Sequence, residues 1–191
     1  MLQLVLATAN PDKVREISSV LGGYELLPRP ADIPEIDETE PTLAGNARLK
    51  AHVLRDATGL PALADDTGLE VAALGGAPGV VSARYSGPDA TYASNVAKLL
   101  GELKGVEDRR ARFRTVIHVA FPDGRDVSAE GAIEGVITVS PRGTHGFGYD
   151  PVFQPDGADD RTLAEMTLAE KNSLSHRARA LRALVAQLSG T

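Results

Sequence analysis

The sequence predicts an α/β fold from three observations. A short apolar run is followed at once by a helix with clear start and stop signals, a later stretch alternates as two strands around a tight turn, and the C-terminal segment is amphipathic. These features fall in residues 2–23, 111–140 and 162–190. With 191 residues, the chain suits a single domain, residues 1–191, with room for two lobes.

Composition narrows the classes to which the protein can belong. Hydrophobic residues make up 42% and charged residues 24%, which is typical of a folded globular protein. No apolar run reaches the ~18 residues of a membrane span and the N-terminus lacks a signal-peptide pattern, so we expect a cytoplasmic protein with no membrane partner. The absence of cysteine excludes disulfides and thiolate ligands. A net charge of −6 disfavours a nucleic-acid polymer as partner but allows a nucleotide.

The turn between the first strand and the first helix is the first candidate binding site. Asn10 is a good N-cap, Pro11 suits the first helical position, and Asp12 complements the helix dipole. Free backbone N–H groups at this helix end, donors from Thr8 and Asn10, and the charge of Lys13 would suit a phosphate. An ordinary capped helix with a solvated lysine explains the same residues, and the spacing of a Gly-rich phosphate loop is lacking.

An acidic segment, residues 31–42, lies before the next predicted helix. Its five carboxylates belong to Asp32, Glu35, Asp37, Glu38 and Glu40. A solvated acidic loop explains such a run. A loop in which one or two carboxylates face a hard cation explains it as well.

The helix predicted over residues 42–59 has an apolar face and a stop signal. The apolar face is formed by Leu43, Ala47, Ala51 and Leu54, and Gly59 ends the helix. Arg48 and Lys50 are expected to be solvent-exposed charges on this helix.

Asp65 and Asp66 stand side by side where the hydrophobic pattern predicts a buried strand. The apolar residues before them and the Thr67-Gly68 step after them predict that the pair ends the strand at the edge of the core. Adjacent side chains of an extended chain point to opposite faces, so the two carboxylates are expected to differ in role. A metal or ligand contact and an Asx turn are both compatible with this pattern.

The middle of the chain contains a further helix and a hairpin. Thr91 is a candidate N-cap for a helix over residues 91–105. The alternating run at 111–121 and the Pro-Asp-Gly turn after it predict a β-hairpin. His118 falls on the strand face opposite the main apolar side, and a single histidine there is more typical of structure than of catalysis.

A glycine-rich segment, residues 141–157, includes Phe147, Tyr149 and Phe153. Its glycines permit close approaches of the backbone, and an aromatic ring offers a face on which a planar base can stack. The alternative interpretation is a loop that its aromatic side chains anchor in the core.

Two capping-box patterns follow this segment, at Thr162 with Glu165 and at Thr167 with Glu170. They predict a short turn followed by a long terminal helix. A group of polar side chains near the start of that helix lies off its predicted apolar stripe and would pass for solvated residues; they are Lys171, Ser175, His176 and Arg177.

In its order of motifs, the chain resembles the inosine/xanthosine triphosphate pyrophosphatases over essentially its whole length. The matching stretches are "ATANPDK", "ET" ahead of "NARLKA", "ADDTGLEVAALGGAPGVVSARYSG", "GFGYDPVF", "T-AEM", "EKN" and "SHRARAL". Any one of these stretches is weak evidence for the family, but their occurrence together in this order is specific to it.

The resemblance implies a mixed, twisted central sheet flanked by helices, in two lobes with the active-site cleft between them. It also implies a Mg²⁺-dependent hydrolase that splits (d)ITP and XTP into the nucleoside monophosphate and pyrophosphate, and so cleanses the nucleotide pool. A homodimer is expected because members of the family form one.

The resemblance assigns roles to residues of this chain. Asp66 would be the catalytic carboxylate and a metal ligand, Glu38 a second metal contact, and Asp65 a supporting neighbour. Predicted substrate contacts are Thr8, Ala9, Asn10, Pro11, Asp12 and Lys13 for the triphosphate, Thr67 for the substrate in general, Phe147, Gly148, Tyr149 and Asp150 for the base pocket, and Lys171, His176 and Arg177 for the base edge.

One departure from the family pattern concerns the metal site. Many relatives have an acidic residue before the "NA" dipeptide, where this chain has Gly45, and Leu43 stands where an aromatic residue is usual. If that acid helps to hold the metal in the relatives, the site here would bind Mg²⁺ more weakly or use Glu35, Asp37 or Glu40.

Two other functions remain open at this point. One is a related nucleotide pyrophosphatase that prefers another base, such as a modified pyrimidine. The other is a nucleotide-sensing module without catalysis, which the missing acidic residue at Gly45 motivates.

Overall fold

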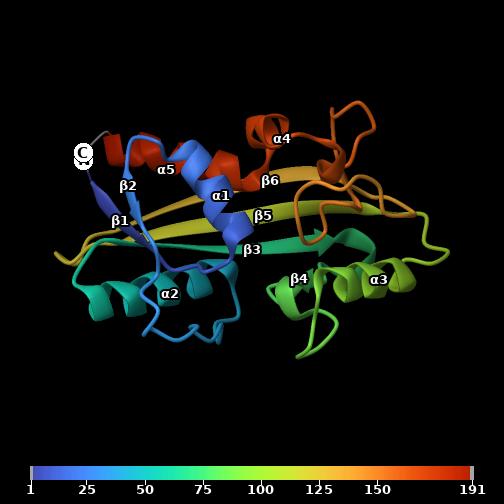
Figure 1. The fold of residues 1–191 in the computed structure, drawn as a ribbon. Helices are drawn as coiled ribbons and strands as arrows, with labels where there is room; N and C mark the ends of the chain where they lie inside the picture. The colour runs from blue at the N-terminus through green and yellow to red at the C-terminus, as the bar shows by residue number, and fades with distance from the viewer. Residues whose placement is uncertain (1, 190–191) are drawn as a thin grey trace. The chain divides into compact units, whose positions relative to one another are not determined.

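The structure is a computed structural model that describes residues 2–189. The ends of the predicted domain, residue 1 and residues 190–191, lie outside this range. The described part of the chain contains seven strands and five α-helices (Figure 1). The strands are β1 (Gln3–Leu6), β2 (Glu25–Leu27), β3 (Ala62–Val71), β4 (Pro78–Gly79), β5 (Arg110–Ala120), β6 (Asp126–Ile137) and β7 (Phe153–Pro155). The helices are α1 (Pro11–Val20), α2 (Leu43–Thr58), α3 (Tyr92–Glu102), α4 (Leu168–Leu174) and α5 (His176–Ser189).

The strands form one mixed sheet, which confirms the predicted fold class. The strand order is β2-β1-β3-β5-β6-β7, with β4 paired to β3 off this path. β1 pairs in parallel with both β2 and β3, whereas β4 and β7 pair antiparallel with their neighbours. The predicted hairpin is present as β5 and β6.

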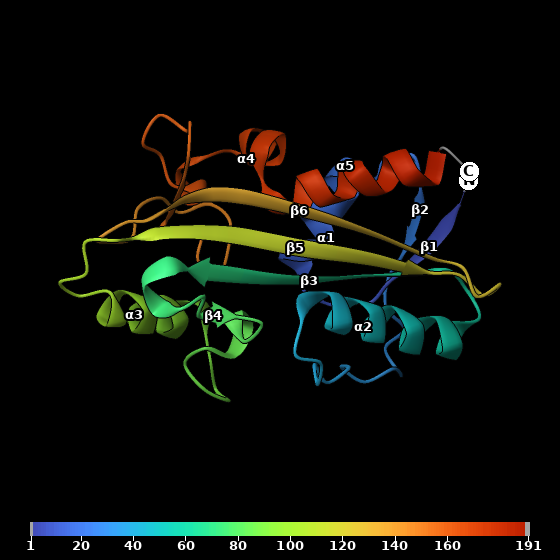
Figure 2. The same ribbon diagram turned by 180° about the vertical axis from the view of Figure 1, so that it is seen from behind.

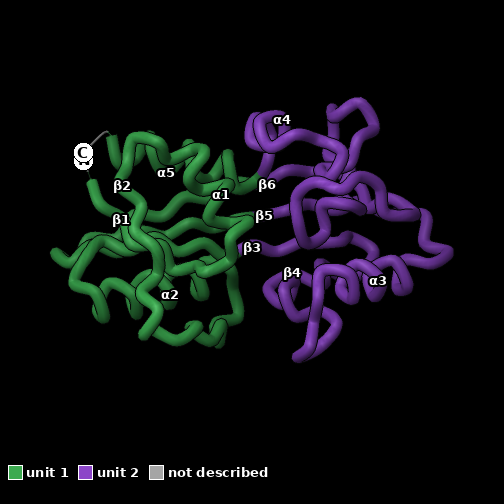
Figure 3. Tube along the Cα trace, viewed as in Figure 1, with its two compact units in different colours: residues 1–66, 115–131, 176–191 green, residues 67–114, 132–175 purple. Residues whose placement is uncertain are grey.

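The chain divides into two compact units, which Figure 3 distinguishes by colour. Unit 1 comprises residues 1–66, 115–131 and 176–191, and unit 2 comprises residues 67–114 and 132–175. The three long strands β3, β5 and β6 each contribute residues to both units. The prediction of a single domain with a cleft between two lobes stays a prediction.

In unit 1, helices cover both faces of the sheet. Helices α1 and α5 lie on one face and α2 lies on the other (Figures 1 and 2). Alternation along β1 explains this layering, because Leu4 and Leu6 pack with residues of α1 and α5, whereas Val5 packs with Leu54 of α2. The result is a sheet buried on both faces, as is usual for parallel strands.

Helix α5 lies unusually close to the sheet at Gly131 of β6. A Cβ atom at that position would come within 2.2 Å of the carbonyl oxygen of His176 and 2.4 Å of the amide nitrogen of Ala180. Only glycine permits this approach. It holds the first turn of α5 against the strand.

Unit 2 has its own apolar core between its strands and α3. The core is formed by residues such as Leu69, Leu99, Phe113, Phe153 and Leu163. The rings of Phe113 and Phe153 meet edge to face at 4.7 Å between centroids.

Most of the predicted helix boundaries are confirmed. Asn10 caps α1, Gly59 ends α2 in the left-handed conformation at φ 67°, and Thr91 forms a capping box at α3. Both C-terminal capping boxes are present.

The long terminal helix was a wrong prediction. Ser175 has an extended backbone, with φ −66° and ψ 155°, so the segment is two helices, α4 and α5. Within the range 2–189, no helix is both long and apolar enough to cross a membrane.

Candidate active site

Asp65 and Asp66 occupy the interior of β3 and not its end. β3 continues without interruption through Thr67 and Gly68 to Val71, so the predicted strand end and the Asx turn are both wrong. The physical reason is that β1 ends first, since its Leu6 pairs with Leu63. β3 runs on beyond its neighbour, and the two carboxylates come just after that point.

The two carboxylates point to opposite faces of the sheet, as the alternation of a strand predicts. Asp65 contacts residues of α1 and α5, and Asp66 contacts residues of α2. Both side chains are buried, with 3% and 4% of the residue surface exposed. Adjacent carboxylates therefore lie in two different environments.

Asp65 is surrounded by positive charge. Its Oδ2 lies 3.1 Å from the Nζ of Lys13 and accepts hydrogen bonds from the guanidinium of Arg177 at 3.1 and 3.2 Å. Arg177 also donates to Glu16, which is itself buried. Burial alone would raise the pKa of Asp65, but Lys13 and Arg177 outweigh it and hold that pKa well below its usual range. Asp65 is therefore a permanent anion.

The start of α1 is a capped helix whose lysine is not solvated. Asn10 accepts hydrogen bonds from the backbone nitrogens of Asp12 at 2.9 Å and Lys13 at 3.4 Å, and Thr8 Oγ1 accepts one from the Asn10 nitrogen. The expectation that these helix-end N–H groups are free was therefore wrong for Asp12 and Lys13. The interpretation of Lys13 as a solvated charge was wrong too, because Asp65 holds its ammonium beside the helix end.

Asp66 belongs to a second charged group on the α2 side. Its Oδ1 lies 3.1 Å from the Nζ of Lys50, and that same nitrogen is 2.8 Å from Oε1 of Glu38. Asn46 donates to Asp66 Oδ2 at 3.3 Å and is fully buried. Two carboxylates thus aim at one cation.

The surroundings of Asp66 on this side keep its pKa close to neutral pH. Burial raises the pKa of Asp66 to about 6, with Lys50 acting to lower it and Glu38 acting to raise it. For Lys50, burial acts to lower the pKa, but the carboxylates of Asp66 and Glu38 outweigh burial and raise it. Lys50 therefore stays protonated, while Asp66 is the group that can exchange a proton near neutral pH.

Lys50 and Asn46 are site residues that sequence reasoning missed. The expectation that Arg48 and Lys50 are solvent charges holds for exposed Arg48 but is wrong for Lys50, which is 9% exposed. A signal was available, because Lys50 lies seven residues after Leu43 and three after Ala47 and so shares the buried stripe of α2. A polar residue on an apolar stripe needs a buried partner.

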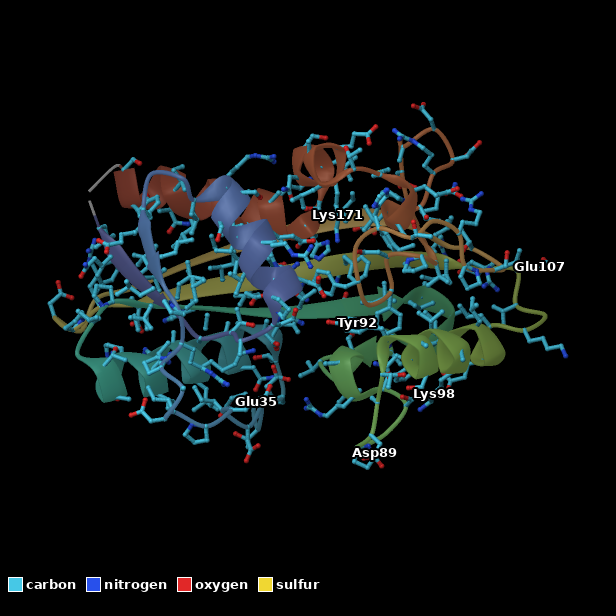
Figure 4. The ribbon with its side chains drawn as sticks, in the orientation of Figure 1. Glu35, Asp89, Tyr92, Lys98, Glu107 and Lys171 are labelled. Carbon is cyan, nitrogen blue, oxygen red and sulfur yellow. The ribbon has the colours of Figure 1, made fainter. Side chains whose placement is uncertain are left out.

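The acidic segment combines the two interpretations that the sequence allowed. Glu35, Asp37 and Glu40 are exposed, and Figure 4 shows Glu35 in the loop that precedes α2. Glu38 is half-buried and contacts Lys50. The segment is a solvated loop with one carboxylate turned inward.

His176 and Arg177 lie at the start of α5 and are buried, so their interpretation as solvated charges was wrong. They are 3% and 2% exposed. The break at Ser175 explains this, because it starts a new helix with its own buried face. Ser175 itself is fully buried.

In unit 2, the predicted base-pocket residues cluster around Asp150. Its Oδ2 accepts a hydrogen bond from the backbone nitrogen of Phe147 at 2.8 Å and forms a buried ion pair with Lys171 at 2.5 Å. The ammonium of Lys171 lies 4.9 Å from the centre of the Phe147 ring. The ring of Tyr92 also lies near Phe147, with 5.8 Å between ring centres. Figure 4 labels Tyr92 and Lys171.

Two glycines allow the loop to close on Asp150. A Cβ atom at Gly146 would meet Asp150 Oδ2 at 2.1 Å, and Gly146 has φ 72°. Gly148 also has a positive φ, 62°. The loop is thus built to bring backbone and carboxylate together.

Tyr149 fits the alternative interpretation, in which an aromatic side chain anchors this loop in the core. Its hydroxyl donates to the carbonyl oxygen of Ser82 at 2.9 Å, and the residue is 5% exposed. Phe147 is only half-buried, and so is Thr67, which follows Asp66 in β3. Of these aromatic residues, Phe147 has a ring that solvent reaches.

The predicted metal ligands Asp66 and Glu38 do not belong to a clustered set of three donor side chains within residues 2–189. Over residues 2–189, one group of three histidine or carboxylate side chains brings its donor atoms within 4.8 Å of one another. It consists of His52, His118 and Asp126, and includes neither Asp66 nor Glu38.

Comparisons with known proteins agree along the whole length of the chain. Residues 4–187 match the model of the Ham1 family. A protein of Syntrophobacter fumaroxidans named dITP/XTP pyrophosphatase is 52% identical over 182 residues, covering 93% of this chain and 78% of that protein. One of the same name from Streptomyces avermitilis is 46% identical, covering 97% and 96%.

Solved structures give the same result for the fold. A HAM1 protein from Coxiella burnetii is 41% identical, covers 100% of both chains and has a TM-score of 0.90. The Ham1 protein of Staphylococcus aureus is 37% identical, covers 98% of both chains and has a TM-score of 0.88. With sequence, fold and the motif order in agreement, the chain belongs to the Ham1 family.

Proposed function

We propose that this chain hydrolyses non-standard purine nucleoside triphosphates, namely dITP, ITP and XTP, to the nucleoside monophosphate and pyrophosphate. Relatives that carry the name dITP/XTP pyrophosphatase match nearly all of the chain. The observation that carries the proposal is the pair Asp65 and Asp66, one a fixed anion that holds Lys13 and the other a carboxylate with a pKa of about 6. A triphosphate needs a cation to hold it and a base to activate water, and this pair supports both.

The donor set on the α2 side fits a divalent cation. Glu38 and Asp66 each direct one carboxylate oxygen at the Lys50 ammonium, at 2.8 and 3.1 Å, so two hard oxygen donors already converge on one positive centre. Such donors suit Mg²⁺. In the proposal Asp66 and Glu38 hold Mg²⁺, which when bound neutralises phosphate charge and polarises a phosphoryl oxygen. Lys50 keeps the two carboxylates close together.

Asp66 is proposed to activate water. Its raised pKa lies close enough to neutrality for it to be ionised at pH 7 and still accept a proton. The water attacks a phosphorus atom in line with the leaving group, and Asp66 takes the proton that the water loses. No covalent enzyme intermediate is needed.

The start of α1 is proposed to bind the triphosphate. Lys13 supplies the charge, and the helix dipole favours an anion at this end. Residues 8–13 form the loop and first turn that would surround the phosphates. Because Asp65 and Asn10 hold this segment in place, the triphosphate meets a pre-formed site.

Recognition of the base is assigned to four side chains. We propose that the Phe147 ring stacks on the purine, and that Lys171, His176 and Arg177 donate hydrogen bonds to its edge. Hypoxanthine and xanthine carry an oxygen at C6, which accepts such bonds, whereas the adenine amino group does not. Thr67, Gly148, Tyr149 and Asp150 complete the proposed contacts.

Arg177 has a further role in this proposal. Its guanidinium contacts both Asp65 and Glu16, so any hydrogen bond to a base would come from a cation that, together with Lys13, keeps Asp65 ionised. A change at Arg177 would therefore affect stability as well as specificity.

Glu40 is proposed as the carboxylate that serves in place of the missing acid at position 45. A Cβ atom at Gly45 would come within 2.7 Å of Cβ and 3.1 Å of Cγ of Glu40, so the Glu40 side chain fills the space that a residue at 45 would need. We expect Glu40→Gln to raise the Mg²⁺ concentration for half-maximal activity several-fold. Glu35→Gln, in the same exposed loop, is the matched control and should leave that concentration unchanged.

The test of the proposed function is a substrate panel. Pyrophosphate release is measured with ITP, dITP, XTP, ATP, GTP and modified pyrimidine triphosphates in Mg²⁺. Preferential turnover of ITP, dITP and XTP supports the proposal. Preference for a pyrimidine would favour the related enzyme with another base, and tight binding of ITP without turnover would favour a sensing module.

The cellular setting and assembly remain part of the proposal. We propose a cytoplasmic enzyme, where the nucleotide pool is, that forms a homodimer and binds neither membranes nor nucleic-acid polymers. Light scattering during size exclusion tests the dimer directly, and a monomer mass would reject it.

A further inference from the structure

Three elements of unit 1 bring two histidines and an aspartate together away from the proposed catalytic carboxylates. His52 comes from α2, His118 from the end of β5, and Asp126 from the start of β6. Each offers one donor atom, and these atoms lie within 4.8 Å of one another. Lys50 and His52 are two residues apart on α2, about 200° around the helix, so the two groups occupy different sides of it.

Packing of α2 on the sheet brings these side chains together. Ala51 of α2 packs with Ala64 of β3 and Ala120 of β5 in a small cluster of alanines. His118 lies two residues before Ala120 and so shares its face of the strand. The short alanine side chains bring the helix close, and His52 beside Ala51 meets His118, with 5.6 Å between ring centres.

The distances from Asp126 to the two histidines are close to those between the ligands of a four-coordinate metal. Nε2 of His52 lies 2.9 Å from Oδ2 and 3.1 Å from Oδ1 of Asp126, and Nε2 of His118 lies 3.4 Å from the same Oδ2. Ligands at about 2.1 Å from a tetrahedral Zn²⁺ lie roughly 3.4 Å apart. No large movement is needed to place an ion among the three.

The burial and hydrogen bonding of the His118 ring indicate that this residue binds a ligand. The residue is 6% exposed, and its buried Nε2 forms no well-aligned hydrogen bond with a described residue, although Asp126 Oδ2 lies 3.4 Å away. A buried ring nitrogen without such a bond costs free energy unless something binds it.

The surrounding charges leave a position open to solvent. His52 and Asp126 have side chains 27% and 28% exposed, so water can fill a fourth position. The nearest cation is Arg48, whose Nε lies 3.7 Å from Asp126 Oδ2, and its side chain is 64% exposed. Arg48 can therefore swing into solvent when an ion binds.

We propose that His52, His118 and Asp126 form a second metal site, specific for a borderline divalent ion such as Zn²⁺, Co²⁺ or Ni²⁺ and separate from the proposed Mg²⁺ site. Two imidazoles and one carboxylate with an open position are the donor set that these ions prefer, whereas Mg²⁺ prefers oxygen ligands and its own waters. The site ties α2 to β5 and β6, so bound metal stabilises unit 1.

The test measures binding of Zn²⁺ and Co²⁺ to the whole chain in excess Mg²⁺, which saturates oxygen-only sites. Calorimetry gives stoichiometry and affinity for Zn²⁺, and visible absorption of Co²⁺ reports a four-coordinate histidine site. We expect one ion per chain, and at least about tenfold weaker binding in His52→Gln and in Asp126→Asn, because even loss of an outer-shell partner costs that much. Zn²⁺ should raise the melting temperature of the parent chain but not that of His52→Gln.

Matched controls come from the same residue types elsewhere. His145→Gln changes an exposed histidine, and Asp89→Asn changes an exposed aspartate that Figure 4 labels, so both should bind as the parent does. His52 is half-exposed on a helix, so its substitution is expected to leave the fold intact. Equal binding by His52→Gln and the His145→Gln control, or no binding by the parent chain, would overturn the proposal.

Discussion

The two faces of β3 shift the pKa values of two adjacent carboxylates in opposite directions. On the α1 and α5 face, Asp65 meets two cations, Lys13 and Arg177, and its pKa is held low. On the α2 face, Asp66 contacts one cation, Lys50, which it shares with Glu38, and burial raises its pKa to about 6 although Lys50 and Lys13 both act to lower it. The number of cations for each carboxylate thus separates a structural anion from a reactive one.

Burial alone does not decide what a carboxylate does. Both aspartates are almost fully buried, and burial acts to raise the pKa of each, although for Asp65 the cations outweigh it. The partners that the two helical layers supply make the difference. Substitutions on each face should therefore have different consequences, and the following experiments separate them.

The largest effect is expected for Asp66→Asn. The substitution removes the proposed base and a metal ligand while keeping the shape of the side chain, so kcat for ITP should fall by about 10²–10⁴-fold. At pH 7 the free energy of unfolding should fall less than in Asp65→Asn, because an ionised carboxylate of raised pKa does not stabilise the fold. Steady-state kinetics and urea denaturation measure the two quantities, with Asp89→Asn as control. Retained turnover would remove Asp66 from the mechanism.

Asp65→Asn should show the opposite pattern, with stability affected first. It removes the carboxylate that Arg177 and Lys13 share, and breaking a buried ion pair costs about 3–5 kcal/mol. Urea denaturation measures this loss directly. If Asp65→Asn were as stable as the parent chain, the assignment of this face as the structural one would be wrong.

Lys13→Ala tests the link between the Asp65 face and the substrate. Removing the ammonium should raise KM for the triphosphate by about tenfold or more, since a charge-assisted hydrogen bond to phosphate is lost, and should change kcat less. Arg15→Ala is the matched control, because Arg15 lies on the same helix and its side chain is 70% exposed. Unchanged KM and kcat in Lys13→Ala would refute the phosphate assignment.

The smallest effect is expected from a shift of one pH unit, and it separates the two carboxylates without any substitution. Because the pKa of Asp66 is raised to about 6, the folded protein takes up a proton there as pH falls through 6, and the reactive carboxylate is lost. In limiting Mg²⁺, kcat/KM should fall about tenfold per pH unit below 6. Saturating Mg²⁺ binds the ionised form and should move this limb to lower pH.

The same titration predicts how stability depends on pH. For an acid of raised pKa, the folded state binds the proton more tightly, so the contribution of Asp66 to stability decreases as pH rises from about 4 to 6. Asp65 has a lowered pKa, so its contribution is present above about pH 4 and is lost only in strong acid. Denaturation of the parent chain and of Asp66→Asn at pH 4.5 and 7 measures the contribution of Asp66. If the free energy of unfolding changed equally between the two pH values in both proteins, this prediction would be contradicted.

Local signals in the sequence were sufficient for much of the fold. The cap at Asn10, the stop at Gly59 and the capping boxes at Thr91, Thr162 and Thr167 are short-range hydrogen-bond patterns, and the structure contains each of them. The hairpin of β5 and β6 follows from strict alternation around a Pro-Asp-Gly turn. Such features need only the residues near them.

Long-range features were the ones that failed. β3 was expected to end at Asp66 because Thr67-Gly68 has turn chemistry, but the strand continues in the sheet beside β5. Lys50 was expected in solvent because it is charged, although its place on the stripe of α2 indicated burial. Arg177 was expected to be solvated and is 2% exposed, because Ser175 starts a new helix whose first turn packs against Gly131.

The sequence by itself determined that residues 65 and 66 would face opposite ways, since the pleat of any strand separates adjacent side chains. It also determined the caps, the hairpin and, through the order of its motifs, the family. Only the tertiary structure decided which cations each carboxylate would meet: Lys13 and Arg177 for one, Lys50 for the other. These partners come from helices far apart along the chain, and the pKa of a buried group depends on the charges that folding brings within a few ångströms.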